Sequence, residues 1–138
     1  MADFVDTNVF VYAFDNDEPV KQARAREVLR ERPDAVISTQ VMLEWHSVVT
    51  RKFSPPLTAE AARAGLAALS GLEVVPADAE LVVRAAETAV AHRLSIWDAM
   101  IIESASLAGC ARLLTEDLSD GTTIRGVTVH NPFAPEDG

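Results

Sequence analysis

Short apolar runs alternate with longer helix-forming segments along most of the chain, and this alternation constrains the fold more than any other feature. Such an order is typical of a parallel sheet covered by helices on both faces. The sequence therefore predicts an α/β fold, in which functional sites form at the carboxyl ends of the strands. The expected strands are 4–5, 35–38, 72–76, 112–115 and 127–129, and the expected helices are a short turn at 9–14 and segments at 17–32, 39–53, 58–70, 78–92 and 95–109.

Residues that begin or end helices mark several of these boundaries. Thr39, Thr58 and Ser95 each stand at the start of a helix-forming segment and can accept a hydrogen bond from its first turn. Pro55-Pro56 ends the helix that begins near Thr39, because a proline disfavours helical backbone in the residue before it. Gly71 is typical of the residue that closes a helix.

Composition and charge exclude several classes of protein. With 138 residues, of which 49% are hydrophobic and 24% charged, the chain is suited to one folded domain with a real core and is not typical of a disordered protein. We expect that domain over 1–133 and a short disordered tail over 134–138. The net charge of −9 argues against a protein that grips nucleic acid through a broad basic face.

Three features bear on location. The single cysteine, Cys110, cannot form an intrachain disulfide, and with no evident histidine partner it is expected to be a small buried residue and not a nucleophile. The start of the sequence lacks the basic and apolar regions of a signal peptide. No apolar run approaches the roughly 20 residues that a membrane helix needs. We therefore expect a cytoplasmic protein with no membrane partner.

Two acidic residues stand where a carboxylate is costly. Asp6 directly follows the first expected strand, at its carboxyl end, although an aspartate there also caps a following helix. Asp98 lies on the same helix stripe as Ile101 and Ile102, so it points along the buried face. The alternative for Asp98 is a capping arrangement with Ser95 near the positive end of the helix dipole. That alternative explains an acid in the first turn but not its place on the core-facing stripe.

Two further acids are less easily assigned. Glu44 flanks the apolar stripe of Val41, Trp45 and Val48, and the alternatives are a surface glutamate or a residue of a site. Asp117 follows the expected strand at 112–115, close to its carboxyl end. Each of the four acids has an ordinary explanation, so the argument for a site depends on their being brought together.

The four acids together indicate a metal site. An alternating fold brings strand ends and helix starts to one rim, where several carboxylates repel one another and lose hydration unless a cation neutralises them. All-oxygen ligand sets favour Mg²⁺ or Mn²⁺. Paired divalent ions held by carboxylates are a recurrent means of breaking phosphodiester bonds, since one activates water and the other stabilises the leaving oxygen.

Four segments, in order, resemble the motifs of PIN-domain ribonucleases, specifically the VapC-type toxins of toxin–antitoxin pairs. The resemblance covers the chain from about residue 4 to residue 132, and the order of the motifs makes it fairly specific. The segments are Phe4-Val5-Asp6-Thr7-Asn8-Val9-Phe10-Val11-Tyr12-Ala13, Ile37-Ser38-Thr39-Gln40-Val41-Met42-Leu43-Glu44, Ser95-Ile96-Trp97-Asp98-Ala99-Met100-Ile101-Ile102 and Leu113-Leu114-Thr115-Glu116-Asp117-Leu118.

This resemblance implies a three-layer PIN-like fold with a central parallel sheet of about five strands, and Mg²⁺- or Mn²⁺-dependent cleavage of RNA. It also implies a cognate antitoxin and a homodimer. The acidic cluster, both catalytic and metal-binding, would be Asp6, Glu44, Asp98 and Asp117. Polar motif positions that support it would be Asn8 and Thr115, and an additional acid would come from Glu116 or from Asp120, which also suits an ordinary turn.

The sequence offers few residues to hold the RNA. Arg51 and Lys52 stand at the end of the helix that carries Glu44, where the alternative role is favourable pairing with the helix dipole. Trp45 and Trp97 are adjacent to acids, and packing is favoured over base stacking for them. Because bound cations would raise the potential of the site, the net charge of −9 is compatible with metal-dependent engagement of RNA.

Two other functions remain open at this point. A PIN-like scaffold that binds a partner without catalysis would share the fold, although acids at all four motif positions argue against it. An aspartate-based phospho-transfer domain is also α/β with acids at strand ends. The dehalogenase-like form of that domain needs a second aspartate two residues after the first, where this chain has Asn8.

Overall fold

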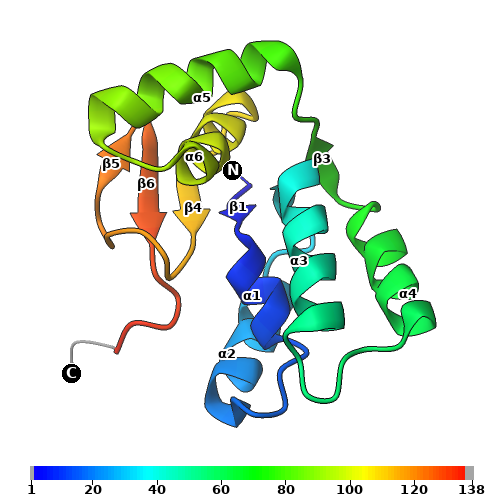
Figure 1. Cartoon of the computed structure of the whole chain (residues 1–138). Helices are drawn as coiled ribbons and strands as arrows, with labels where there is room; N and C mark the ends of the chain where they lie inside the picture. Colours follow the sequence, from blue (N-terminus) through cyan, green and yellow to red (C-terminus); the bar gives the residue numbers. More distant parts are fainter. Residues whose placement is uncertain (1, 136–138) are drawn as a thin grey trace.

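The computed structural model describes residues 2–135, so residues 136–138 of the expected tail lie outside the described residues. Strands and helices alternate along the chain as the sequence predicts (Figure 1). In chain order the elements are β1 (Phe4–Val5), α1 (Thr7–Tyr12), α2 (Pro19–Arg30), β2 (Val36–Ser38), α3 (Thr39–Arg51), α4 (Ala59–Leu69), β3 (Glu73–Val75), α5 (Ala79–His92), α6 (Ile96–Leu107), β4 (Arg112–Leu114), β5 (Thr123–Ile124) and β6 (Val127–His130).

The strands form one sheet in the order β3-β2-β1-β4-β6-β5. All neighbouring strands are parallel except the pair of β5 and β6, which confirms the expected α/β fold with a mostly parallel sheet. The sheet has six strands where about five were expected. The additional strand, β5, has two residues and joins β6 through Arg125 and Gly126, both at positive φ. A strand of two residues is too short to show the alternation by which strands are recognised in a sequence.

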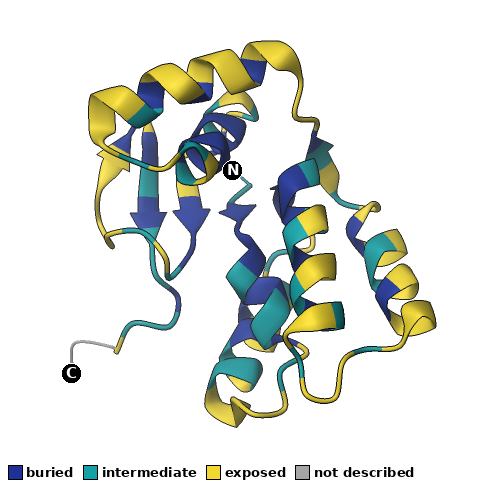
Figure 2. Cartoon of the chain, in the orientation of Figure 1, coloured by how far each residue is buried: buried dark blue, intermediate teal, exposed yellow. Residues whose placement is uncertain are grey.

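Helices cover the sheet, and its strands β1 and β2 are buried throughout. Helix α6 packs against α5 and against β2, β4 and β6, while α3 contacts β2 and α1. In Figure 1, β4, β5 and β6 lie on one side of β1, and α3 and α4 lie on the other. Figure 2 shows most strand residues buried and the outer face of α5 exposed. Strands buried on both faces are typical of parallel sheets, and the core residues Phe4, Ile37, Leu113 and Leu114 are fully buried here.

The helix starts agree with the sequence at two positions and differ at a third. Thr58 and Ser95 cap α4 and α6, accepting hydrogen bonds from the backbone N–H groups of residues 61 and 98. The expectation that Thr39 caps α3 is wrong, because Ser38 does so and its Oγ accepts from the N–H of Val41. Thr39 is instead the first helical residue, and its Oγ1 accepts from the N–H of Ala77 at 3.2 Å.

The arrangement places the ends of β1 and β4 side by side. The backbone N–H of Asp6 donates to the carbonyl of Leu114 at 3.0 Å, directly beyond the paired strand residues. Helix α1 begins immediately after β1, and Thr115 immediately follows β4. The carboxyl ends of the two central strands therefore deliver polar side chains to one edge of the sheet. Within residues 2–135, no helix has both the length and the apolar character that crossing a membrane requires.

Candidate active site

Asp6 lies at the junction of β1 and α1 and is only 7% exposed. Its Oδ1 accepts from the backbone N–H of Thr7 at 2.7 Å, and its Oδ2 accepts from Oγ1 of Thr115 at 2.8 Å. The two explanations offered by the sequence therefore hold together, because the same carboxylate lies at a strand end and accepts from the first residue of a helix.

The pKa of Asp6 is raised to about 6. Burial is the main cause, the hydrogen bonds from Thr7 and Thr115 oppose it, and the negative charges of Asp117 and Glu44 raise the pKa further. A buried carboxylate whose charged neighbours are also acids is costly in a metal-free protein. Such a combination is characteristic of functional sites.

Glu44 is half-buried on α3 and receives a hydrogen bond on each carboxylate oxygen. Its Oε2 accepts from Oγ1 of Thr7 at 3.0 Å, and its Oε1 accepts from Nε2 of Gln40 at 2.8 Å. Because Thr7 follows Asp6 directly, the first of these bonds ties α3 to the end of β1. Glu44 is thus held in place and is not a freely moving surface glutamate.

Asp98 is half-buried in the first turn of α6. The pKa of Asp98 is raised, chiefly by burial, against a hydrogen bond with Ser95 and with help from the charges of Asp117 and Glu44. Its backbone N–H also donates to Oγ of Ser95 at 3.0 Å. The capping arrangement and the approach to the other acids therefore coexist at this residue.

Thr115 links Asp6 to the fourth acid, Asp117. The Thr115 side chain is fully buried, and its Oγ1 donates to Asp6. The same Oγ1 accepts from the backbone N–H of Asp117 at 3.1 Å and from Nδ2 of Asn8 at 3.0 Å. The same Nδ2 donates to Oδ2 of Asp117 at 3.1 Å. Asn8 and Thr115 thus contact the acids that the sequence associates with them, while Asp117 itself is exposed.

These four carboxylates fit a hard divalent cation in their chemistry. Their oxygens come from four parts of the fold, the ends of β1 and β4 and the helices α3 and α6. Among the described residues no lysine or arginine contributes to the pKa of Asp6 or Asp98. The Oδ1 atom of Asn8 is buried and accepts no hydrogen bond, which adds a neutral oxygen without a partner. Over residues 2–135, no three acidic, histidine or cysteine side chains are already gathered tightly enough to form a preformed metal site.

A groove of about 560 Å³ runs beside these acids between α1 and α3. Glu44 and Asp117 line it together with Thr7 and Asn8, and Lys52 lines it beyond the end of α3. Other lining residues are Val11, Tyr12, Asp15, Ser47, Val48 and Phe53. The groove gives an extended molecule access to Glu44 and Asp117, with the basic side chain of Lys52 along its wall.

The PIN domain model of protein families matches residues 4–119, which is most of the chain. The chain belongs to the PIN domain family. Solved structures with the same fold include a toxin–antitoxin complex from Klebsiella pneumoniae, with a TM-score of 0.71, 22% identity and coverage of 96% of this chain and 98% of that one. A comparison with curated proteins found no match.

Two other solved structures also share the fold of this chain. VapC20 of Mycobacterium tuberculosis, named as a toxin that cleaves the sarcin–ricin loop, has a TM-score of 0.67 and 23% identity over 81% of this chain and 87% of that one. VapBC2 of Rickettsia felis, bound to a promoter DNA fragment, has a TM-score of 0.63 and 21% identity over 95% of this chain and 98% of that one. At these identities the likeness establishes the PIN fold that the sequence motifs imply.

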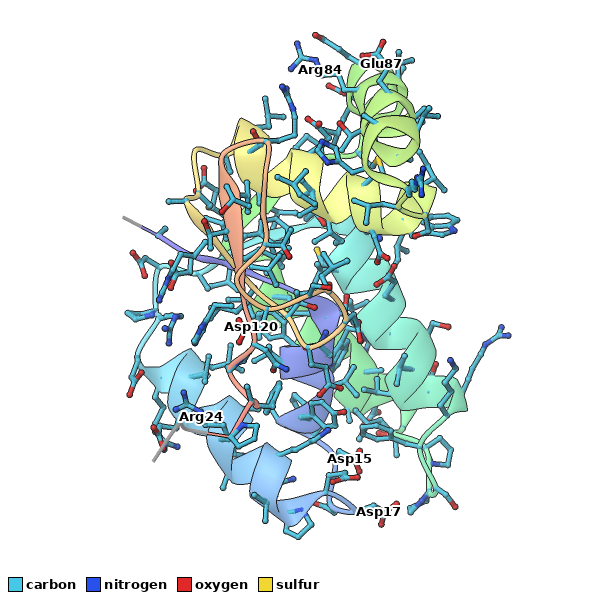
Figure 3. All side chains as sticks on the ribbon, turned by 90° about the vertical axis from the view of Figure 1, so that its left-hand side faces the viewer. Asp15, Asp17, Arg24, Arg84, Glu87 and Asp120 are labelled. Carbon is cyan, nitrogen blue, oxygen red and sulfur yellow. The ribbon has the colours of Figure 1, made fainter. Side chains whose placement is uncertain are left out.

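In this PIN domain, Glu116 and Asp120 have partners other than the acidic cluster. Glu116 accepts hydrogen bonds from the hydroxyl of Tyr12 and from Nζ of Lys21, the latter at 3.1 Å. Asp120, labelled in Figure 3, accepts from the backbone N–H of Asn131 at 3.0 Å. Neither acid contributes to the raised pKa of Asp6 or Asp98.

The two basic candidates also differ in placement. Lys52 lines the groove of the PIN domain, whereas Arg51 is exposed in the last turn of α3 and does not line it. Of the two tryptophans, Trp45 is buried as packing requires. The prediction that Trp97 packs in the core is wrong. Its side chain is 65% exposed beside Asp98, because its position at the start of α6 turns it outward.

Sequence reasoning missed several residues that hold the site of this PIN domain together. Thr7 and Gln40 bond to Glu44, and Tyr12 and Lys21 bond to Glu116 on the segment that carries Asp117. A signal existed only for Gln40, which stands four residues before Glu44 on one helix face. Lys21 and Glu116 are far apart in the sequence, so no local pattern connects them.

Proposed function

We propose that this PIN domain is a metal-dependent endoribonuclease, the toxin of a toxin–antitoxin pair of the VapC type. The observation that carries the proposal is that Asp117 and Glu44, which line the groove, raise the pKa of both Asp6 and Asp98, while no lysine or arginine among the described residues lowers either pKa. The fold shared with VapC20, named as a toxin that cleaves the sarcin–ricin loop, supports the same activity. The acids proposed for catalysis are Asp6, Glu44, Asp98 and Asp117.

The same four acids are proposed to hold Mg²⁺ or Mn²⁺. A bound cation of this kind supplies activation of water and stabilisation of the leaving oxygen during phosphodiester hydrolysis. Carboxylate oxygens are the ligands that these ions prefer. The pKa of Asp6 is raised first by burial and then by the charges of Asp117 and Glu44, and a bound cation would offset both costs.

The protein's own side chains would do the remaining work. Thr115 and Thr7 orient the carboxylates of Asp6 and Glu44 through hydrogen bonds of 2.8 and 3.0 Å. The proposed backbone contact is Lys52, whose ammonium group in the groove offers a point charge to an RNA phosphate. Arg51 stands outside the groove, so any contact it makes with the RNA backbone would lie farther from the acids than that of Lys52.

An antitoxin, a homodimer and a cytoplasmic location complete the proposal. One of the similar structures is a toxin–antitoxin complex by name, and another is VapBC2 bound to promoter DNA, which supports an antitoxin partner. An apolar groove of about 480 Å³ shares Glu44 with the acidic groove and includes exposed Leu43, Val82 and Trp97. Exposed apolar surface next to a functional groove is typical of a protein partner site.

The decisive experiment incubates the purified protein with total RNA in Mg²⁺, Mn²⁺ or chelator and maps the cut ends. We expect cleavage only with a divalent ion, and its loss in Asp6→Asn and Asp98→Asn. The matched control is Asp17→Asn, an exposed acid on the segment between α1 and α2 that Figure 3 shows at the edge of the molecule. Undiminished cleavage by either site variant overturns the assignment.

Calorimetry separates the enzyme from an inert PIN-like scaffold. Titration of the protein with Mn²⁺ should give heat that disappears in Asp6→Asn and persists in Asp17→Asn. A scaffold that only binds a partner would show no carboxylate-dependent heat. That result, together with intact RNA, would replace the proposed nuclease by a binding function.

A further inference from the structure

Gln40 is a buried polar residue in the first turn of α3, and no role is assigned to it by the acidic motifs. It is 8% exposed, and it stands one helical turn before Glu44. A buried amide must find hydrogen-bond partners, because burying it without them costs on the order of 1–3 kcal/mol. The partners that Gln40 finds are both parts of the candidate site.

The amide nitrogen of Gln40 makes two hydrogen bonds. Nε2 donates to Oε1 of Glu44 at 2.8 Å and to the backbone carbonyl of Trp97 at 3.2 Å. Both partners are acceptors only, so the nitrogen must face them and the alternative orientation of the amide is excluded. The two N–H groups of one amide are thereby used on two different helices.

These bonds connect two acids that the fold brings from separate elements. The carbonyl of Trp97 belongs to the residue directly before Asp98, in the first turn of α6. A single side chain of α3 therefore holds the carboxylate of Glu44 and the backbone that carries Asp98. Thr7 completes the arrangement by donating to the other oxygen of Glu44 at 3.0 Å.

We propose that Gln40 is a positioning residue, which sets the carboxylate of Glu44 relative to Asp98 so that both face the same cation. The inference rests on the proposed function. Gln40 touches neither the groove of the acidic site nor the reacting atoms, since it is absent from the groove lining. Its effect passes through Glu44 and through the start of α6, as partners of metal ligands commonly act.

The amide is required by the chemistry of its two partners. A methionine at position 40 keeps a similar volume and length but offers no donor to Glu44 or to the carbonyl of Trp97. A glutamate at position 40 would place a second carboxylate against two groups that only accept hydrogen bonds, the carboxylate of Glu44 and the carbonyl of Trp97. Gln40→Met is therefore the variant that removes positioning while keeping the packing of α3.

The test compares Gln40→Met with wild type and with Gln22→Met. Gln22 lies on α2 and is half-buried, and its side-chain amide donates to Asn16, outside the candidate site, so its variant controls for the change from an amide to a thioether. Mn²⁺ affinity is measured by calorimetry without RNA, the kinetics with RNA by steady-state cleavage, and folding by thermal unfolding.

We expect Gln40→Met to bind Mn²⁺ about 10–100-fold more weakly than wild type. The rate constant kcat should fall by more than KM changes, because the groove that receives RNA is untouched. Gln22→Met should match wild type in every measurement. A folded Gln40→Met that binds Mn²⁺ as tightly as wild type overturns the inference, since a merely packed Gln40 would give that result.

A second measurement holds whether or not that variant folds. In wild-type protein, the side-chain amide of Gln40 should appear in nitrogen–proton NMR spectra as a slowly exchanging pair, and Glu44→Gln should shift it. A rapidly exchanging pair overturns the inference even where the nuclease activity is found. Conversely, wild type that binds no cation and cuts no RNA refutes the proposed function, while a protected pair would still support the contact itself.

Discussion

Replacing the catalytic candidate Asp6 by asparagine should stabilise the metal-free protein. Asp6 is buried, and its pKa is raised to about 6 from an ordinary 3.8, first by burial and then by Asp117 and Glu44 against two opposing hydrogen bonds. At neutral pH the folded protein must keep this carboxylate charged. Asn at the same position has nearly the same shape and carries no charge, so the variant escapes that cost.

The size of the effect follows from the pKa values. The difference between about 6 and 3.8 corresponds to about 3 kcal/mol at neutral pH. Thr115 donates to Oδ2 of Asp6, and in the variant this hydroxyl faces an amide nitrogen that cannot accept, which costs on the order of 1 kcal/mol. We therefore expect a net gain of about 2 kcal/mol, or roughly 5–8 °C in Tm for a domain of this size.

The direction of the pH dependence is fixed by which state binds more protons. Between about pH 4 and pH 6 the folded wild type holds a proton on Asp6 that the unfolded chain has lost, so the free energy of unfolding falls as the pH rises through this window. Below pH 4 both states are protonated and the contribution is constant. Asp6→Asn lacks this contribution, and its advantage over wild type should grow across the window and then level off.

The assay is urea denaturation of wild type, Asp6→Asn and Asp17→Asn at several pH values in the presence of a chelator. Asp17 is exposed and its carboxylate forms no ion pair within the described residues, so its variant should track wild type. An advantage of Asp6→Asn that is the same at pH 4 and pH 7.5 would refute the electrostatic reasoning. So would a variant less stable than wild type at pH 7.5.

Three further predictions concern buried groups outside the acidic cluster: the carboxylate of Glu103, the ring of Trp45 and the thiol of Cys110. Arg125→Met should lower the free energy of unfolding by about 1–3 kcal/mol in a denaturant titration, because it strips the buried Glu103 carboxylate of a 3.0 Å partner; unchanged stability would show that Thr88 alone satisfies it. Gly65→Ala should cost about 1–3 kcal/mol in the same titration, because its Cβ would meet the Trp45 ring at 2.2 Å; an unchanged Tm would contradict this. Cys110, whose pKa is raised to about 11 chiefly by burial, should resist a thiol reagent at pH 7.5 in the native protein, and prompt labelling would contradict its burial.

The order of elements and the acids at their ends could be predicted because each has a local signal. The alternation of strands and helices is visible in residue types, and Asp6 and Asp98 stand out because each interrupts an apolar pattern. Thr58 and Ser95 were recognisable as caps for the same reason, since capping depends on a residue and its next three neighbours. Ser38 and Thr39 are both capping residue types, and only the three-dimensional structure distinguishes them.

The rest depends on contacts between distant segments. Strand β5 exists because it pairs with β6, and its own two residues carry no signal. The pairing of Glu116 with Lys21 joins positions 95 residues apart, so the sequence could not tell that this acid is occupied. The exposure of Trp97 likewise follows from how α6 begins, beside the start of α3, and not from its neighbours in the chain.

The net charge of −9 reflects an excess of acids, and the raised pKa of Asp6 reflects the cost of burying one of them near Asp117 and Glu44. Acids gathered at a strand end lower the stability of the metal-free fold. A cation that binds only the folded state raises the free energy of unfolding by mass action, by about 2.7 kcal/mol when its free concentration is 100 times its dissociation constant. Mn²⁺ should therefore raise the Tm of wild type and leave that of Asp6→Asn unchanged. The two proteins would then exchange their order of stability as the ion is added, which is the behaviour expected when an acidic site is retained for its cation and not for the fold.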